Sequence, residues 1–143
     1  MRAVKILYLC TENSCRSQMA EAWTKHLKGD RIEVLSAGVD PHEIDPGAIK
    51  VMAEKGVDIS GYKSKHIDSF AGIQFDYVIT LCQNARETCP YFPARVRHVH
   101  VAFDDPQRFA SMERGEEEVL KHYRRVRDEI RSFVEKLPGI LTE

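Results

Sequence analysis

Residues 4–17 read VKILYLCTENSCRS, and this stretch decides the fold. Residues 4–9 form an apolar run rich in strand-forming residues, and the polar residues 11–14 interrupt it with turn chemistry. From Arg16 onward the apolar residues recur at helical spacing, at Met19, Ala20, Trp23 and Leu27. The stretch therefore predicts a strand, a short loop and a helix that ends near Gly29.

Strands and helices continue to alternate along the chain. Further strands are predicted over residues 32–37, 75–81 and about 96–103. Asp45-Pro46 is typical of a helix start, and Gly56 of its end, with Ile49, Met52 and Ala53 on one apolar face. A long amphipathic helix is predicted from near Glu116 to Pro138, with an apolar stripe of Val119, Leu120, Tyr123, Val126, Ile130, Phe133, Val134 and Leu137.

This alternation predicts parallel strands joined by right-handed crossovers. The chain of 143 residues has the length of one domain, residues 1–143. We therefore expect a three-layer α/β domain in which helices cover both faces of a four-stranded parallel sheet. On the last helix, Arg124, Arg125 and Arg127 alternate with acidic residues and are expected to form a solvated face.

Composition and charge exclude several classes of protein. Apolar residues make up 43% of the chain, which excludes wholesale disorder. The 21 Lys and Arg nearly balance the 22 Asp and Glu, so bulk positive charge does not drive binding to nucleic acid. No apolar run approaches the roughly 20 residues that cross a bilayer, and the first residues lack the layout of a signal peptide. We expect a soluble cytoplasmic protein that binds neither nucleic acid nor membrane, and nothing requires more than a monomer.

The loop after the first strand has the chemistry of an oxyanion site. It lies where open α/β sheets bind ligands, between the carboxyl end of a strand and the amino end of a helix. Backbone N–H groups and the positive helix end would hold a tetrahedral oxyanion, and Arg16 would add a bidentate guanidinium. The same dipoles would lower the pKa of Cys10 and make it a nucleophile, with Ser17 placed to donate a hydrogen bond to its sulfur. The predicted substrate-binding residues are Thr11, Glu12, Asn13, Ser14, Cys15 and Arg16.

Cys10, Arg16 and Ser17 have the Cys-x5-Arg-Ser spacing of the phosphatase loop. Because this loop follows the first strand, the chain resembles the low-molecular-weight tyrosine phosphatases, and the expected fold is theirs. Cys15, inside the loop, is expected to be a small buried thiol rather than a catalytic one.

Two further cysteines and an Asp-Pro pair extend the resemblance. The complete set, Cys10-x5-Arg16, Cys82-x6-Cys89 and Asp105-Pro106, is similar to that of the thioredoxin-coupled arsenate reductases, relatives of these phosphatases. The resemblance implies that Cys10 attacks arsenate, that Cys82 attacks the Cys10 sulfur and expels arsenite, and that Cys89 then attacks Cys82. Thioredoxin would reduce the Cys82–Cys89 disulfide, and phosphate or sulfate would mimic arsenate.

Geometry adds a predicted motion in the segment between these two cysteines. If residues 82–89 were helical, their ends would lie roughly 10 Å apart. A disulfide requires Cα atoms within about 7 Å. The segment is therefore predicted to unwind when Cys82 and Cys89 are joined.

Asp105 is the predicted general acid, because a carboxylic acid at this rim can protonate a departing oxygen. Asp104 is its neighbour, and the family pattern, which places the acid immediately before proline, selects Asp105. The tyrosine phosphatases follow this proline with aromatic residues that hold a phosphotyrosine ring. Gln107 and Arg108 stand there in this chain, which disfavours an aryl substrate.

The sequence departs from the family pattern at two positions. Glu12 replaces the commoner loop glycine, and its carboxylate would repel an oxyanion unless it points outward. Some members hold potassium with side chains that match Asn13, Glu21 and Ser36 plus an aspartate, but that aspartate matches Lys65 here. The Lys65 ammonium would occupy the place of the cation, so no metal is predicted. No cofactor is predicted either, and the four cysteines are badly spaced for zinc.

Two alternatives use the same residues differently. One is a low-molecular-weight protein tyrosine phosphatase whose extra cysteines protect the nucleophile by reversible oxidation. The other is a redox- or metal-responsive regulator that binds arsenite or zinc through its thiols. Replacement of Cys82 by serine separates the three, because the reductase would lose turnover, the phosphatase would keep it and the regulator would lose metal binding.

Overall fold

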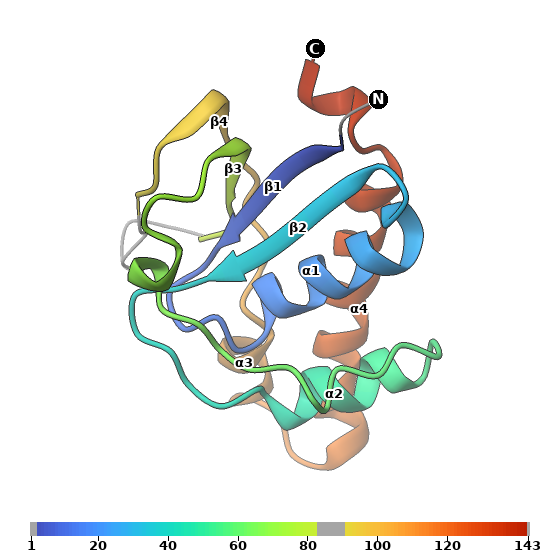
Figure 1. Ribbon diagram of the computed structural model, residues 1–143. Coiled ribbons are helices and arrows are strands. Elements are labelled where there is room, and N and C mark those ends of the chain that lie inside the picture. Colours follow the sequence, from blue (N-terminus) through green and yellow to red (C-terminus); the bar gives the residue numbers. More distant parts are fainter. Residues whose placement is uncertain (1–2, 83–90, 143) are drawn as a thin grey trace.

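The computed structural model describes residues 3–82 and 91–142, and its centre is a four-stranded sheet. The strands are β1 (Val4–Leu9), β2 (Ile32–Ala37), β3 (Phe75–Thr80) and β4 (Ala94–His100). They are all parallel and lie in the order β2-β1-β3-β4 (Figure 1). The predicted parallel α/β fold is confirmed.

Strand β4 differs from its prediction by a few residues at each end. It begins at Ala94 and ends at His100, whereas the sequence pattern suggested about 96–103. The pairing with β3 sets these bounds, because Phe75 is opposite Ala94 and Thr80 is opposite His100. An edge strand is only as long as the neighbour that supplies its hydrogen bonds, and β3 ends at Thr80.

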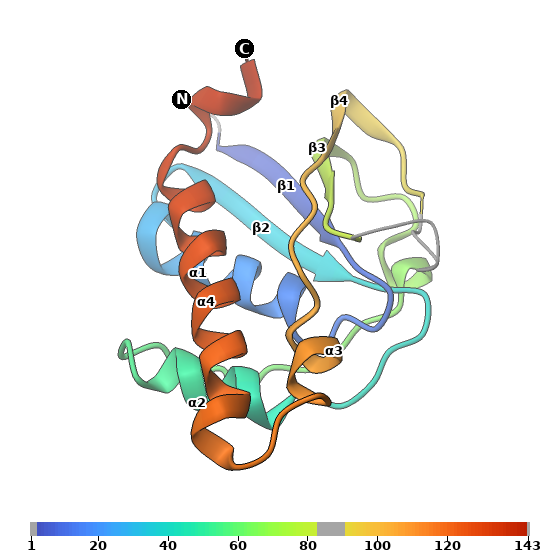
Figure 2. The ribbon, with the colours of Figure 1, turned by 180° about the vertical axis from the view of Figure 1, so that it is seen from behind.

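One face of the sheet is covered by helices α1 (Arg16–Lys28), α2 (Pro46–Ala53) and α4 (Glu116–Glu135). Helices α1 and α4 cross each other on this face, and α2 lies near the start of α4 (Figure 2). The predicted stripe of α4 faces this core, and Trp23 of α1 is fully buried in it. Hydrophobic burial of this kind is the main stabilising term of a small domain.

The second face is covered more thinly in the described residues. The 3₁₀ turn η1 (Ile67–Phe70) packs Ile67 and Phe70 against Leu7, Leu9 and Val78. A second such turn, η2 (Gly139–Thr142), follows α4 and packs Leu141 into the main core. In the described residues, the third layer of the domain therefore consists of η1 and its flanking loops.

Two local predictions are corrected by the structure. On α2, Ala53 is exposed and the buried residues are Ala48, Val51 and Met52, because α4 covers that side. Arg127 is buried rather than solvated, since its Nη1 donates to Val51 O at 2.9 Å and to Glu54 at 2.8 Å. These partners belong to the end of α2, 73 to 76 residues away in sequence, so the pattern within α4 could not reveal them.

A short helix, α3 (Pro106–Ala110), lies between β4 and α4 and was not predicted. Asp105 caps it and Pro106 opens it, the same start signal that marks α2. Its five residues are too few to produce a helical pattern in the sequence. In the residues that the structure describes, no helix is both long and apolar enough to cross a membrane.

Candidate active site

The loop from Cys10 to Cys15 joins the carboxyl end of β1 to the amino end of α1. Cys10 N donates to Ala37 O of β2 at 3.2 Å, and Leu81 N donates to Leu9 O at 2.9 Å, so both neighbouring strands hold the start of the loop. Gly38 packs directly beneath it. A Cβ atom on Gly38 would lie 2.4 Å from Thr11 O and 2.7 Å from Cys10 O, so only glycine permits this approach.

The carbonyl groups of residues 11–14 in the loop have partners on its outer side. Those of residues 11, 12 and 14 accept hydrogen bonds from main-chain N–H groups in the segment 39–45, and that of Asn13 accepts from Gln18 and Ser64. In a trans peptide the N–H of the next residue points opposite to the carbonyl. The N–H groups of residues 12–15 are therefore directed to the inner side of the loop. Such a concave set of N–H groups suits a tetrahedral oxyanion.

Asn13 holds the loop in this shape. It is completely buried and has a φ of 52°, a left-handed conformation that asparagine tolerates better than most residues. Its Nδ2 donates to Ser17 Oγ at 2.7 Å and to Ser36 Oγ at 2.9 Å. Its Oδ1 accepts from Gln18 Nε2 at 3.0 Å and from the backbone N–H of Lys65 at 2.9 Å. One side chain thus joins the loop to α1, β2 and the segment before η1.

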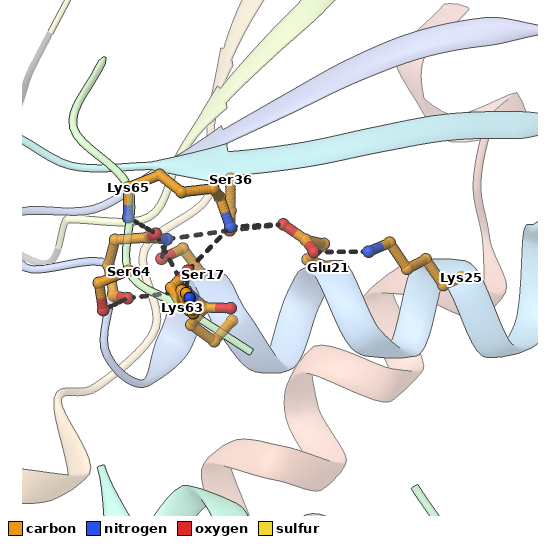
Figure 3. A network of polar contacts seen from close by, with 9 residues as sticks. Ser17, Glu21, Lys25, Ser36, Lys63, Ser64 and Lys65 are labelled. Atoms are coloured by element: carbon orange, nitrogen blue, oxygen red, sulfur yellow. Dashed lines mark hydrogen bonds and ion pairs between the residues drawn. The ribbon is translucent and has the colours of Figure 1, made fainter. Parts of the chain in front are cut away.

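A buried carboxylate continues this network (Figure 3). Glu21 accepts a hydrogen bond from Ser36 Oγ at 2.7 Å and pairs with Lys25 at 2.8 Å and Lys65 at 3.4 Å. The Lys65 ammonium also donates to Lys63 O at 3.2 Å. Lys65 therefore lies against Glu21, and two ammonium groups offset the buried charge. That Lys65 takes the place of a cation stays a prediction. We call this set the Asn13 wall: Asn13, Ser17, Glu21, Lys25, Ser36 and Lys65.

Arg16 closes the opposite side of the loop. Its guanidinium is buried, and Nη1 donates to Leu81 O at 3.4 Å and to Phe103 O at 3.2 Å. Its Nη2 lies 4.0 Å from Asp105 Oδ2. The ends of β3 and of the segment after β4 thus hold the guanidinium at the rim of the loop, where it faces Asp105.

The two adjacent aspartates have different surroundings. Asp104 pairs with Arg125 of α4 at 2.8 Å, whereas Asp105 faces Arg16 and caps α3 through Gln107 N at 3.0 Å. Asp105 thus lies next to the loop arginine. This geometry favours the choice of Asp105 that the family pattern suggested.

The three described cysteines, Cys10, Cys15 and Cys82, are in the thiol form rather than in disulfides, and all are buried. Cys10 follows β1 and Cys82 follows β3, the neighbouring parallel strand, so both lie at the same edge of the sheet. Burial raises the pKa of the Cys15 thiol well above its usual value, and the nearby Asp45 and Asp105 carboxylates raise it further. Cys15 is accordingly a neutral thiol under the loop. Cys89, and most of the segment predicted to unwind, lie outside the described residues.

Ser17 and Glu12 have partners that bear on their predicted roles. Ser17 Oγ accepts from Asn13, which leaves its own hydrogen available for another acceptor; its donation to Cys10 stays a prediction. Glu12 is half-buried, and its carboxylate accepts a weak hydrogen bond from Ser14 Oγ at 3.4 Å. Its backbone carbonyl is held by His42, whose pKa the Glu12 carboxylate helps to raise.

The described residues contain no group of three or more His, Cys, Asp or Glu side chains that could hold a metal ion. His98 and His100 on β4 contact Phe92 O at 2.7 Å and Thr80 Oγ1 at 2.8 Å, respectively. These contacts are local to the edge of the sheet.

Residues 5–143 match the family described as low molecular weight phosphotyrosine protein phosphatase. The chain belongs to this family. An arsenate reductase from Bacillus subtilis (strain 168) is 49% identical over 127 residues, which cover 88% of this chain and 89% of that protein. The resemblance expected from the sequence, to the arsenate reductases with the phosphatase fold, is confirmed.

Solved structures agree with this assignment. One described as an arsenate reductase in the phosphate binding state superposes with a TM-score of 0.76 at 32% identity, over 94% of this chain and 95% of that one. A thioredoxin-dependent arsenate reductase from Corynebacterium glutamicum superposes with a TM-score of 0.62 at 26% identity, over 94% of this chain and 63% of that one. The phosphatase-family fold therefore extends over nearly the whole chain.

Three residues beside the loop were not predicted as part of the site. Asp45 was noted only as a helix cap, Gln107 only as a missing aromatic residue, and Tyr123 only as part of a core stripe. The structure brings them together, since both Gln107 Nε2 and Tyr123 Oη donate to Asp45 Oδ2 at 2.7 Å. Sequence separations of 62 and 78 residues leave no local signal for such a cluster.

Proposed function

We propose that this member of the phosphatase family reduces arsenate to arsenite with its own cysteines. One observation carries the proposal: Cys10 and Cys82 are buried cysteines in the thiol form at the ends of adjacent parallel strands. Arg16, at the start of α1 directly after the loop, donates to the carbonyl of Leu81, the neighbour of Cys82. A phosphatase needs only one of these thiols, whereas a reduction by two electrons needs two.

In the first step the loop binds arsenate, an anion with the shape and charge of phosphate. The N–H groups of residues 12–15 and the Arg16 guanidinium bind its oxygens, and the sulfur of Cys10 attacks arsenic. A bond from sulfur to arsenic forms while a bond from arsenic to oxygen breaks. Asp105 gives its proton to the departing oxygen, which leaves as water.

In the second step the Cys82 thiolate attacks the sulfur of Cys10. The Cys10–Cys82 disulfide forms, the bond from sulfur to arsenic breaks, and its electron pair stays on arsenic. Arsenic is thereby reduced from the pentavalent to the trivalent state, and arsenite leaves. The two electrons come from the two thiols, so no cofactor is required.

In the third step Cys89 attacks Cys82 and releases Cys10 for another cycle. The resulting Cys82–Cys89 disulfide is reduced by thioredoxin in the cytoplasm, where thioredoxin keeps thiols reduced. The dependence on thioredoxin is supported by the description of the Corynebacterium glutamicum relative, which names that reductant. The roles of Cys82 and Cys89 come from the resemblance to the arsenate reductases.

Release of arsenite in the presence of thioredoxin, thioredoxin reductase and NADPH tests the proposal. Wild-type protein should turn over repeatedly, while Cys89→Ser should release about one arsenite per chain and then accumulate a Cys10–Cys82 disulfide. Peptide mapping under non-reducing conditions identifies the bond. A Cys10–Cys15 disulfide in protein oxidised by turnover would contradict the relay.

The second candidate is a tyrosine phosphatase with a redox-protected nucleophile, which the family match favours. Cys82→Ser separates the two candidates. The reductase loses arsenite release in this variant, whereas a phosphatase keeps its hydrolysis of p-nitrophenyl phosphate. Full arsenite release by Cys82→Ser would show that Cys82 does not supply the second thiol of the proposed reaction.

A further inference from the structure

We propose that Gln107 and Asp45 are positioning residues that hold the Asp105 carboxyl group against the anion loop. The inference deepens the proposed function and rests on it, because Asp105 is the proton donor of the first step there. Neither residue needs to contact the substrate. Their effect would be exerted entirely through Asp105.

Gln107 connects two carboxylates. Its backbone N–H donates to Asp105 Oδ1 at 3.0 Å, and its side-chain Nε2 donates to Asp45 Oδ2 at 2.7 Å. It is the second residue of α3, a helix of only five residues. A helix this short has little stability of its own, so its first turn needs an external anchor. The bond from Gln107 to Asp45 is such an anchor.

Asp45 is itself fixed to three parts of the fold. Its backbone N–H donates to Ser14 O of the anion loop at 2.9 Å, and its Oδ1 accepts from Gly47 N at the start of α2 at 2.9 Å. Its Oδ2 accepts from Tyr123 of α4 at 2.7 Å as well as from Gln107. Asp45 is buried, and neutral donors from α3 and α4 therefore satisfy this oxygen away from bulk water.

The side chains around the Asp45 carboxylate are closely packed. The Tyr123 ring lies against the backbone of α2 so closely that a Cβ atom on Gly47 would be 2.6 Å from the ring. Tyr123 is buried and belongs to the 20-residue helix α4, one of the main core helices. The hydroxyl that holds Asp45 is thus fixed by the core of the domain rather than by a surface loop.

These contacts close a ring that begins and ends in the anion loop. The path runs from Ser14 to Asp45, then to Gln107, then to Asp105, whose Oδ2 lies 4.0 Å from Nη2 of Arg16. The loop that would bind the oxyanion therefore also sets the place of the proton donor. Displacement of a catalytic group by about 1 Å can slow a reaction on the order of 100-fold, so such a ring has a direct effect on rate.

Gln107→Met tests the inference, because methionine keeps the length of the side chain and removes the amide. The first-turnover rate of arsenite release should fall about 10-fold, while the KM for arsenate stays within about 2-fold. In an Asp105→Asn background, Gln107→Met should cause no further loss, because its effect passes through Asp105. Tyr123→Phe should show the same pattern with a loss of about 2-fold.

Ser111→Ala is the matched control for a loosened α3. Ser111 Oγ donates to Arg108 O at 2.7 Å at the exposed far end of the helix. This variant should keep the wild-type rate. An equal loss in Ser111→Ala, or an undiminished effect of Gln107→Met in the Asp105→Asn background, would overturn the inference in favour of a merely structural role.

Inorganic phosphate gives a readout that does not depend on reduction. Asp105→Asn should tighten phosphate binding about 3-fold in calorimetry, since it removes a negative charge from the rim. Gln107→Met should tighten it in the same direction, because the carboxylate is no longer held there, with no further change in the double variant. If the wild type releases no arsenite, the proposed function fails and the phosphate series still decides the inference. Unchanged phosphate affinity in Gln107→Met would contradict it.

Discussion

The two sides of the anion loop are built from different chemistry. The Asn13 wall contains one buried carboxylate, Glu21, with two lysines against it. Its amide, on Asn13, joins the loop to Ser17 of α1 and Ser36 of β2. The other side, the Asp105 wall (Asp45, Asp105, Gln107 and Tyr123), contains two carboxylates, and both donors that join its members to Asp45 are neutral. The cation that faces this second wall in the described contacts is Arg16.

This difference indicates that one wall sets the conformation of the loop and the other serves proton transfer. Neutralised charges and a multiply bonded amide stabilise one backbone conformation, so the Asn13 wall should determine how well the loop forms. An excess of carboxylate beside an oxyanion opposes binding and is useful only where a proton is to be given. Changes in the Asn13 wall should therefore lower stability and affinity. Changes in the Asp105 wall should lower the rate, with affinity for the anion unchanged or slightly higher.

The largest effect is expected at the centre that both walls serve. Cys10→Ser should reduce arsenite release and any hydrolysis of p-nitrophenyl phosphate below about a thousandth of wild type, because a neutral hydroxyl is a far weaker nucleophile than a thiolate. Phosphate binding in calorimetry serves as the control for an intact loop. Substantial turnover in this variant would show that another group attacks the substrate.

The second effect breaks the Asp105 wall. Asp105→Asn should lower the rate of the first turnover about 100-fold while leaving the KM for arsenate equal or lower. The matched control is Asp104→Asn, which should keep most of the activity, because the Asp104 carboxylate pairs with Arg125 on α4. If Asp104→Asn carries the larger loss, the assignment of the general acid is wrong.

The third effect breaks the Asn13 wall. Asn13→Ala should lower the free energy of unfolding by about 3 kcal/mol, because it leaves buried polar groups unpaired and strains a backbone at φ 52°. Phosphate affinity should fall about 10-fold with it. Asn13→Gly relieves the strain but, like Asn13→Ala, lacks the amide hydrogen bonds. Its free energy of unfolding in urea should therefore be about 1 kcal/mol higher than that of Asn13→Ala. Equal stabilities of the two variants would contradict a strained backbone at this position.

The fourth prediction tests the charge balance of the Asn13 wall. Lys65→Met should lower the free energy of unfolding by about 0.5–1 kcal/mol, because Glu21 keeps its shorter pair with Lys25. The exposed Lys55 provides a control, and Lys55→Met should change little. Wild-type activity should be the same in potassium and sodium chloride, since the Lys65 ammonium stands against Glu21. Activation of the wild type by potassium would show that a metal ion still has a role there.

The smallest effect concerns pH at the outer side of the loop. The hydrogen bond to Asp40 raises the pKa of His42, and the Glu12 carboxylate raises it further. A raised pKa means that the charged imidazole stabilises the folded protein at low pH, and that this contribution disappears as the pH rises through the folded-state pKa. The imidazolium also offsets Glu12, so sulfate affinity should fall about 2-fold over the same range, and less in His42→Asn. Sulfate keeps its charge over this pH range, so the change reports on the protein. If sulfate affinity depends on pH identically in His42→Asn, His42 is not the cause of the change.

Local patterns were sufficient for the elements that carry strong periodicity. The run of residues 4–9, the stripe of α4 and the Asp45-Pro46 start of α2 each appear in the structure where the pattern indicated. Short elements were missed for the converse reason. The turn η1 and helix α3 have four and five residues, too few for a period to show.

The sequence by itself determined the parallel α/β fold, the loop after β1 and the pattern of Cys10, Arg16 and Asp105. It could do so because these features depend on neighbours in the chain: an apolar run, a turn, a helix start and a fixed spacing. The family resemblance rests on the same local features.

Only the tertiary structure decided how the loop is held. Asn13 meets Ser36 and Lys65, Arg127 meets the end of α2, and Gln107 and Tyr123 meet Asp45. Each pair is 23 to 78 residues apart in sequence. A polar residue appears the same in the sequence whether it meets water or a buried partner, since folding alone supplies the partner.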